Sequence, residues 1–260
     1  MAAIWAGAIA FSAQERAFAI RMAEQTTAAL ASAYREHISN MLERVDDLLM
    51  HAKQEFEADP ARFDFSHWAE ASPHLLRLAT QFSRVDRDGV IIASSQGSVA
   101  IGVSIADREH FKVHAERDTG LMHVSKPVLG RTTGKFSIQI SRRLNGADGA
   151  FAGVLIFSLD AAYLAKVYGE GQIGRNGVTS LTGFDGVVRV RTLGDRAEIG
   201  VAELDVPLFR TLLASPEGTH HGPSARDGAA RVTAWEHVDA YPLVVAVSAS
   251  VPEMIEQYAR

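Results

Sequence analysis

The chain has 260 residues, of which 47% are hydrophobic and 22% are charged, a composition typical of a folded protein with room for two domains. Its net charge of −5 leaves no broad basic surface, so we do not expect nucleic acid as a partner. It contains no cysteine, which excludes disulfide bonds and thiolate-bound metals.

The chain begins with an uncharged apolar stretch over residues 2–11. A membrane-spanning helix needs roughly 20 such residues, so this stretch is either the outer end of a transmembrane helix or an ordinary apolar helix end. Trp5 suits a membrane interface and favours the first interpretation. We therefore expect residues 1–11 to be the apolar stub of a transmembrane helix. At the other end, residues 251–260 are expected to form an exit helix toward a second one.

A long helix is predicted next. Residues 12–58 contain no proline or glycine, and their apolar residues recur at intervals of three and four. The pattern indicates one helix, or two in line, about 70 Å long at 1.5 Å per residue. Such a helix beside a compact body is typical of a spine or a dimerisation strut. A shorter helix over 66–80, with a break near Pro73, completes a spine and connector region over 12–74.

An internal repeat organises the remaining chain. A strand, an Asp-Gly turn and a strand over 82–93 recur over 179–190, 97 residues later. A closing hairpin of strands 137–144 and 151–159 recurs as 231–238 and 243–250. Helical segments lie between the opening and closing hairpins, at 107–117 and 207–214. We expect an α+β fold with two subdomains, over 75–168 and 169–250, each an antiparallel sheet with covering helices, joined by a helix over 160–167 and a glycine-rich linker over 169–177.

The first half of the repeat carries the clearest local patterns. A short basic helix is predicted over 107–117 with Asp107 as its N-cap, and an irregular segment comes after it. Residues 136–144 alternate apolar and polar side chains, as a half-buried strand does. Residues 145–149, Asn-Gly-Ala-Asp-Gly, predict a turn. Residues 151–159 form an almost continuous apolar run, which predicts a strand in the middle of the sheet.

The order and spacing of several short motifs resemble the double Cache sensor domains, which are extracytoplasmic, PAS-like modules of bacterial histidine kinases, diguanylate cyclases and chemoreceptors. The motifs that carry the resemblance are Ile105-Ala-Asp-Arg-Glu-His-Phe111, Ile140-Ser-Arg-Arg143, Asp148-Gly-Ala-Phe-Ala-Gly-Val154, Ile173-Gly-Arg-Asn-Gly177 and Asp185-Gly186. The resemblance covers nearly the whole chain. It implies a long N-terminal helix, a membrane-distal and a membrane-proximal Cache half, and flanking transmembrane helices in the bacterial inner membrane, with this region in the periplasm.

The resemblance also implies a ligand site between the distal sheet and its helix-and-loop layer. Carried over by position, the candidate ligand-binding residues come from the helix, the loop and the strand: Arg108, His110, Phe111, Ser125, Lys126, Ser137, Gln139, Ser141 and Arg142. Strand alternation places Ser137, Gln139 and Ser141 on one face and Arg142 on the other. Each polar side chain is either cavity-facing or simply solvent-facing. Arg108 and Arg142 could instead satisfy loop carbonyls or ion pairs.

The expected ligand is a small organic anion, because arginine binds carboxylates bidentately. In the amino-acid-sensing subgroup an aromatic pair follows the helix arginine and a Tyr-x-Asp follows the loop. Here His110 replaces the first aromatic residue, and Val128-Leu129-Gly130 occupies the later positions. The acidic partner for an ammonium group is therefore missing, which argues against an amino acid ligand.

No catalytic residue, metal site or cofactor is predicted. The chain lacks a Gly-x-Ser-x-Gly elbow, an HExxH helix, a Walker loop and kinase signatures. His110 and His114, one helical turn apart and near His123, could ligate zinc, but a surface helix that carries histidines is the favoured interpretation. His220 and His221 are expected in an exposed loop. We expect a dimeric, non-catalytic sensor of a histidine kinase or diguanylate cyclase. The alternative is a ligand-free dimerisation and spacer module that responds to a partner protein.

Overall fold

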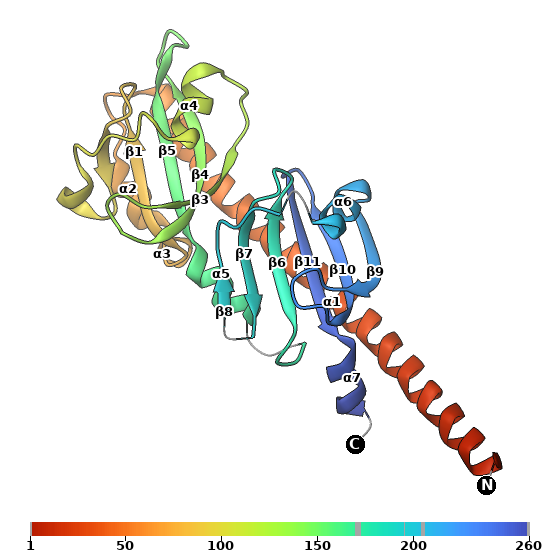
Figure 1. Cartoon of the computed structure of the whole chain (residues 1–260). Helices are drawn as coiled ribbons and strands as arrows, with labels where there is room; N and C mark the ends of the chain where they lie inside the picture. The colour runs from red at the N-terminus through yellow and green to blue at the C-terminus, as the bar shows by residue number, and fades with distance from the viewer. Residues whose placement is uncertain (1, 170–172, 195, 204–205, 259–260) are drawn as a thin grey trace. The chain divides into compact units, whose positions relative to one another are not determined.

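The computed structural model describes residues 2–169, 173–194, 196–203 and 206–258 of the chain (Figure 1). The chain divides into two compact units. We call residues 40–164 the first sheet unit, and residues 1–39 together with 165–260 the second sheet unit. Of the predicted glycine-rich linker, residues 170–172 lie outside the described residues.

Helix α1, Ala2–Ala58, is one continuous helix. Of the two predicted alternatives, one helix or two in line, the first is therefore confirmed. In the first sheet unit it buries a stripe with the three-and-four spacing of a helix face, formed by Leu42, Val45, Leu49, Ala52 and Phe56. The helix ends just before Asp59-Pro60, because a residue that precedes proline is disfavoured in the helical conformation.

Among the described residues, no helix combines the length and the apolar character that crossing a bilayer requires. The membrane stub at residues 1–11, of which Met1 is outside the described residues, stays a prediction. At the other end of the chain, helix α7 covers Val251–Tyr258, and its role as an exit toward a second transmembrane segment also stays a prediction.

The first sheet unit contains a five-stranded antiparallel sheet in the order β2-β1-β5-β4-β3. Its elements are α2 Phe65–Ala71, α3 Pro73–Leu76, β1 Ala79–Val85, β2 Ile91–Ser94, a 3-10 turn over Gly97–Ala100, α4 Glu109–Glu116, β3 His123–Leu129, β4 Phe136–Asn145 and β5 Phe151–Asp160. The apolar run predicted as a central strand is β5, and it is central. Strand β3 was not predicted, because it contains Pro127 and pairs with β4 through an irregular register.

The start of α4 differs from the prediction. The residue at the N-cap position is Arg108, whose side chain makes no capping hydrogen bond. Asp107 lies one residue too early to cap the helix, and its carboxylate binds Arg131 instead. The predicted N-cap role of Asp107 is therefore wrong.

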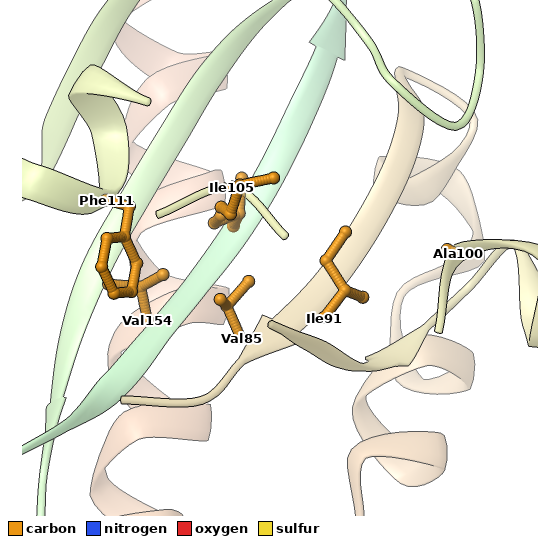
Figure 2. Packing of buried hydrophobic residues seen from close by; sticks show 7 residues of the cluster. Val85, Ile91, Ala100, Ile105, Phe111 and Val154 are labelled. Carbon is orange, nitrogen blue, oxygen red and sulfur yellow. The ribbon is translucent and has the colours of Figure 1, made fainter. Parts of the chain in front are cut away.

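A compact apolar cluster holds α4 and the segment before it against the sheet (Figure 2). Figure 2 shows Val85, Ile91 and Val154 from the strands facing Ile105 and Phe111. These side chains are at least nine-tenths buried. Burying a side chain of this size stabilises the fold by about 1.5–3 kcal/mol. The cluster therefore fixes the helix layer over one end of the sheet.

The second sheet unit contains a six-stranded antiparallel sheet in the order β8-β7-β6-β11-β10-β9. Its elements are α5 Ala161–Gly169, which begins in the first unit, β6 Val178–Gly183, β7 Val188–Leu193, β8 Arg196–Glu198, α6 Pro207–Ala214, β9 Glu217–Pro223, β10 Ala230–Val238, β11 Leu243–Ser250 and α7. His220 and His221 lie in edge strand β9, so the loop predicted for them is wrong. The short strand β9 carries polar residues and glycines, which hid its strand character from the sequence pattern.

The two sheets are copies of one plan, as the repeat predicted. Strands β2, β1, β5, β4 and β3 correspond in order to β7, β6, β11, β10 and β9. The segments that follow the Asp-Gly hairpins also make corresponding backbone hydrogen bonds in the two units. Ile105 N donates to Gly89 O at 2.7 Å, and Glu203 N donates to Gly186 O at 2.7 Å. This pair of bonds makes Glu203 the counterpart of Ile105.

The backbone at Gly153 leaves no room for a side chain. Gly153 in β5 has φ of +127°, and a Cβ atom there would lie 2.0 Å from the Val85 carbonyl oxygen. Gly149 also has positive φ, +76°, but a Cβ there would meet nothing within 4 Å. We expect Gly153→Ala to lower the free energy of unfolding by about 3 kcal/mol, and Gly149→Ala by about 1 kcal/mol, in urea denaturation. Equal losses of unfolding free energy in the two variants would show that the backbone moves to accommodate a Cβ atom next to the Val85 carbonyl.

Candidate functional site

A pocket lies within the first sheet unit, where the sheet meets the segment before α4 and the turn between β3 and β4. Its water-accessible volume is about 40 Å³, which is room for a few water molecules. The lining residues are Thr80, Gln81, Ser83, Ile91, Ile105, Arg108, His110, Val128, Leu129, Gly130, Arg131, Thr132, Thr133, Ser137, Gln139, Ile156 and Ser158. The pocket is therefore small, and uncharged polar side chains predominate among its polar groups.

The floor of the pocket is a set of uncharged side chains held by one another. Ser158 Oγ donates to Gln139 Oε1 at 2.6 Å, and Gln139 Nε2 donates to Ser137 Oγ at 2.8 Å. Thr132 Oγ1, from the β3–β4 turn, donates to Gln81 Oε1 at 2.8 Å. Because their partners lock both amides in one orientation, the floor is preorganised rather than adaptable.

Two arginines line the pocket, and only one of them is neutralised. Arg131 binds Asp107 bidentately, with Nη1–Oδ1 and Nη2–Oδ2 distances of 2.8 and 2.6 Å, and these hydrogen bonds lower the pKa of Asp107 to about 2. Arg108 donates to the Leu129 carbonyl at 3.3 Å, and no carboxylate of the described chain forms an ion pair with it. No acidic side chain is among the lining residues. The pocket therefore carries one uncompensated positive charge.

The α4 histidines lie inside the protein, which corrects the prediction of a surface helix. His114 Nε2 contacts the carbonyl and hydroxyl oxygens of Ser141 at 3.1 and 3.0 Å. His110 is 4% exposed, and its Nδ1 has no hydrogen-bond partner among the described residues. Burial lowers the pKa of His110 to about 3 and that of His114 to about 4, so both rings are neutral at pH 7. Within the described part of the chain, no three His, Asp or Glu side chains are grouped as metal ligands.

The structure brings four of the nine predicted site residues to the pocket: Arg108, His110, Ser137 and Gln139. The other five lie elsewhere. Phe111 is in the apolar cluster, and Lys126 is exposed. Ser125 Oγ accepts a hydrogen bond from the backbone N–H of Gln139. Ser141 faces α4 beyond the pocket and binds the His110 carbonyl at 3.2 Å.

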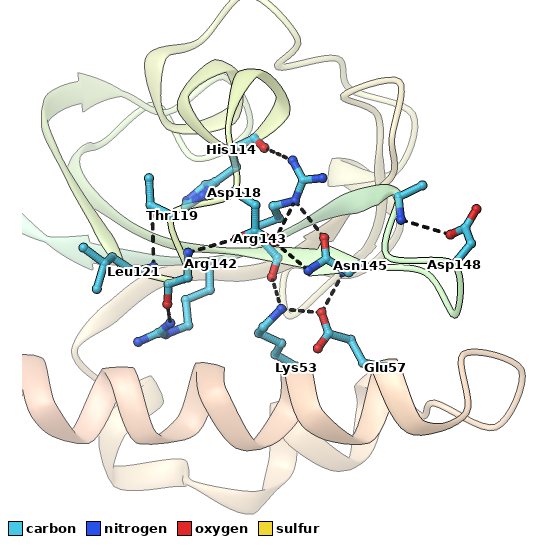
Figure 3. Close-up of polar contacts among 12 residues, drawn as sticks. Lys53, Glu57, His114, Asp118, Thr119, Leu121, Arg142, Arg143, Asn145 and Asp148 are labelled. Carbon is cyan, nitrogen blue, oxygen red and sulfur yellow. Dashed lines mark hydrogen bonds and ion pairs between the residues drawn. The ribbon is translucent and has the colours of Figure 1, made fainter.

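Arg142 points away from the pocket, toward α1 (Figure 3). Its Nη2 lies 2.7 Å from Asp46 Oδ2, and its Nη1 donates to the Gly120 carbonyl at 2.8 Å. The neighbouring Ser141 faces α4, so the predicted alternation of β4 is confirmed. Arg142 was predicted either to bind the ligand or to satisfy an ion pair or a loop carbonyl. In the structure it makes the ion pair and binds the loop carbonyl. Its inclusion with the pocket residues is not supported, since consecutive strand residues point to opposite faces.

Sequence reasoning missed the contribution of β1 and β5 to the pocket. Gln81 and Ser83 come from β1, and Ile156 and Ser158 from β5. The signal for Gln81 and Ser83 was their two-residue spacing on either side of the apolar Phe82, and Ser158 was the polar exception in the β5 run. Which of these polar residues gather was set by the strand order, because β1 and β5 are neighbours only in the folded sheet.

The two buried histidines predict a loss of stability in mild acid. Because their pKa values are lowered in the fold, the unfolded chain binds more protons below pH 6.5, and the free energy of unfolding falls as the pH drops toward 4. Each histidine contributes up to about 1.4 kcal/mol per pH unit. Urea denaturation at pH 7, 6 and 5 should therefore show a shallower decline for His110→Phe than for the wild-type chain. Exposed His51, changed to Gln, is the control. An unchanged slope in His110→Phe would contradict the neutral, buried state.

Comparisons with known proteins support the resemblance to sensor domains. A family model matches part of the sequence, and solved structures match most of the fold. Residues 161–248 match the family model dCache_1_like, described as a histidine kinase sensor domain. No curated protein sequence matches the chain.

Solved structures match over almost the whole chain. The extracellular domain of rpHK1S-Z16, named as a histidine kinase, is 24% identical with a TM-score of 0.80 over 90% of this chain and 96% of that one. The periplasmic sensory domain of the Campylobacter jejuni chemoreceptor Tlp1 is 12% identical with a TM-score of 0.73 over 92% and 98%. The ligand-binding domain of Mlp24 with asparagine is 14% identical with a TM-score of 0.67 over 95% and 99%. This chain therefore shares the fold of these histidine kinase and chemoreceptor sensor domains, and the dCache_1_like model matches its residues 161–248.

Proposed function

We propose that this chain is the extracytoplasmic sensor region of a bacterial membrane receptor and that its first sheet unit binds a small organic anion. The fold and the family match support the sensor role. The charge of the pocket supports the ligand class. The output segment would be a histidine kinase, a diguanylate cyclase or a chemoreceptor signalling segment, and the sensor region would itself be non-catalytic.

One observation carries the proposal. Arg108 lines a preorganised pocket with an uncharged floor and has no carboxylate ion-pair partner in the described chain. The neutral ring of His110, whose Nδ1 has no hydrogen-bond partner among the described residues, lines the same pocket. A guanidinium in a partly desolvated site favours a carboxylate, because charge-assisted hydrogen bonds are shorter and stronger than neutral ones. His110 Nδ1 can pair with a hydroxyl or carboxyl group of the ligand. The small volume limits the ligand to a few heavy atoms unless the β3–β4 turn opens.

The same pocket disfavours an amino acid. Two domains of similar fold were solved in complex with amino acids. Mlp24 holds asparagine, and the Pseudomonas fluorescens chemoreceptor CtaA, which is 16% identical with a TM-score of 0.60 over 85% of this chain and 94% of that one, holds L-alanine. An ammonium group needs an acceptor, preferably an acidic one. Here Asp107, which precedes the pocket-lining Arg108, is already held by both Nη atoms of Arg131.

Ligand binding would act through the segment before α4 and the β3–β4 turn. Arg108 and Arg131 each connect these two segments, through Leu129 and Asp107 respectively. An anion that binds Arg108 would draw the segments together and favour one arrangement of a homodimer formed through α1. Flanking transmembrane helices in the inner membrane would then transmit the change. This coupling requires that the anion bind one arrangement more tightly than the other.

The test compares three-carbon carboxylates with and without an ammonium group on the carbon next to the carboxylate. We expect propionate and lactate to raise the unfolding midpoint of the chain, and L-alanine to leave it unchanged. A ligand at 100 times its dissociation constant stabilises by about 2.7 kcal/mol, which raises the midpoint by several degrees. The measurement is a thermal-shift titration at constant ionic strength. A shift with alanine but not with propionate would reverse the assignment of ligand class.

A matched pair of variants places the binding site. Arg108→Met should abolish the shift, since it removes the uncompensated charge and keeps an unbranched apolar stem. Lys112→Met, which removes an exposed cation from the same helix, should keep it. An absence of any shift across a wider set of small carboxylates would favour the ligand-free spacer.

A further inference from the structure

A buried carboxylate in the second sheet unit is held by two arginines. Arg226 Nη2 donates to Glu203 Oε1 at 2.9 Å, and Arg191 Nη2 donates to the other oxygen, Oε2. The Glu203 side chain is only 9% exposed. Glu198, which is 42% exposed, binds the outer nitrogens of both arginines. Each oxygen of Glu203 thus has its own guanidinium, which is how a protein binds a free carboxylate ligand.

The repeat shows which part of the first unit this cluster corresponds to. Glu203 is the counterpart of Ile105, since both amides bind the glycine of an Asp-Gly turn. Ile105 lines the pocket of the first unit. Glu203 therefore occupies the position in the second unit that corresponds to a pocket-lining residue of the first.

Arg226 also stands at a pocket-lining position. The turn between β3 and β4 is closed by Gly134 N to Gly130 O at 3.0 Å, and the turn between β9 and β10 by Gly228 N to Ser224 O at 2.9 Å. Arg226 is the third residue of its turn, as Thr132 is of the other. Thr132 lines the first-unit pocket.

Arg191 completes the correspondence. At the 97-residue offset of the Asp-Gly turns, it matches Ser94. Ser94 supports the pocket floor by accepting a hydrogen bond from Gln81 Nε2 at 2.9 Å. At the positions that correspond to Ile105 and Thr132, which line the first-unit pocket, and to Ser94, which supports its floor, the second unit has a carboxylate and two arginines.

We propose that the second sheet unit contains a carboxylate-binding site whose permanent occupant is the chain's own Glu203. Its two arginines take an acetate-sized carboxylate, and the tethered side chain of Glu203 excludes any free one. Burial by itself raises the pKa of Glu203, but the hydrogen bonds and charges of Arg191 and Arg226 outweigh it, so the pKa is lowered and the occupant is ionised at pH 7. The site lies in the other unit from the anion pocket, so the two proposals stand or fall separately.

The test is chemical rescue of Glu203→Ala in the full chain. The substitution removes Cγ, Cδ, Oε1 and Oε2, which are the heavy atoms of acetate. We expect a lower unfolding midpoint in sodium chloride, and a midpoint raised by about 2–4 °C when acetate at equal ionic strength replaces the chloride. The gain is counted relative to the wild-type chain, so any effect of acetate on the first-unit pocket cancels.

Three controls separate binding from general salt effects. Acetamide, which has the shape of acetate without its charge, should give no gain. Glu203→Gln, which keeps the space filled, should be destabilised and should not respond to acetate. The double variant Glu203→Ala/Arg191→Met should lose the acetate response, because one of the two guanidinium groups is gone.

Equal midpoints of Glu203→Ala in acetate and chloride, after the wild-type correction, would overturn the proposal. A chain that folds only in acetate would support it. If Glu203→Ala folds in neither salt, Glu203→Ser is measured in the same way, since its hydroxyl can bind one arginine and still leave the carboxylate position open. An absence of an acetate-specific gain in that variant also overturns the proposal.

Discussion

The arrangement of the first sheet unit depends on the burial of strand β4 on both faces. Gln139 and Ser141 face the pocket and α4, while Arg142 reaches Asp46 on α1. A strand alternates its side chains with a strict period of two, so one register determines both contacts. A slip of one residue would bury Arg142 under α4 and turn the pocket floor toward α1. The pocket and the α1 ion pair therefore form together or not at all.

The end of α4 is tied to α1 through the same strand (Figure 3). Arg143 binds the His114 carbonyl at the end of α4 and donates to Asn145 Oδ1 at 2.7 Å. The Asn145 amide in turn donates to Glu57 on α1 at 2.8 Å. Each of these hydrogen bonds involves a charged group, and together they connect the end of α4 to α1. This gives the proposed sensor a physical connection between its pocket and its long helix.

The two sheet units show how one topology serves two purposes. Five strands of each sheet follow the same order and the turn hydrogen bonds repeat, but the side chains at corresponding positions differ. In the first unit, uncharged side chains leave a small pocket with an uncompensated arginine. In the second, Glu203 is bound by two arginines at the corresponding positions. Removing one partner of such a buried group would leave an uncompensated charge, so Glu203, Arg191 and Arg226 depend on one another.

The sequence by itself determined the long helix, the central apolar strand, the Asp-Gly turns and the twofold plan, because periodicity and turn chemistry are local properties. Of the site residues predicted from the family resemblance, Arg108, His110, Ser137 and Gln139 line the first-unit pocket. Strand β3, with its Pro127, and strand β9, with its glycines, lacked a local signal. Only the tertiary structure decided that Gln81 and Ser158 join the pocket, that Arg142 belongs to α1 and that Glu203 meets Arg191 and Arg226. These groups lie far apart along the chain and become neighbours through strand order and register, which the long-range packing of the sheets sets.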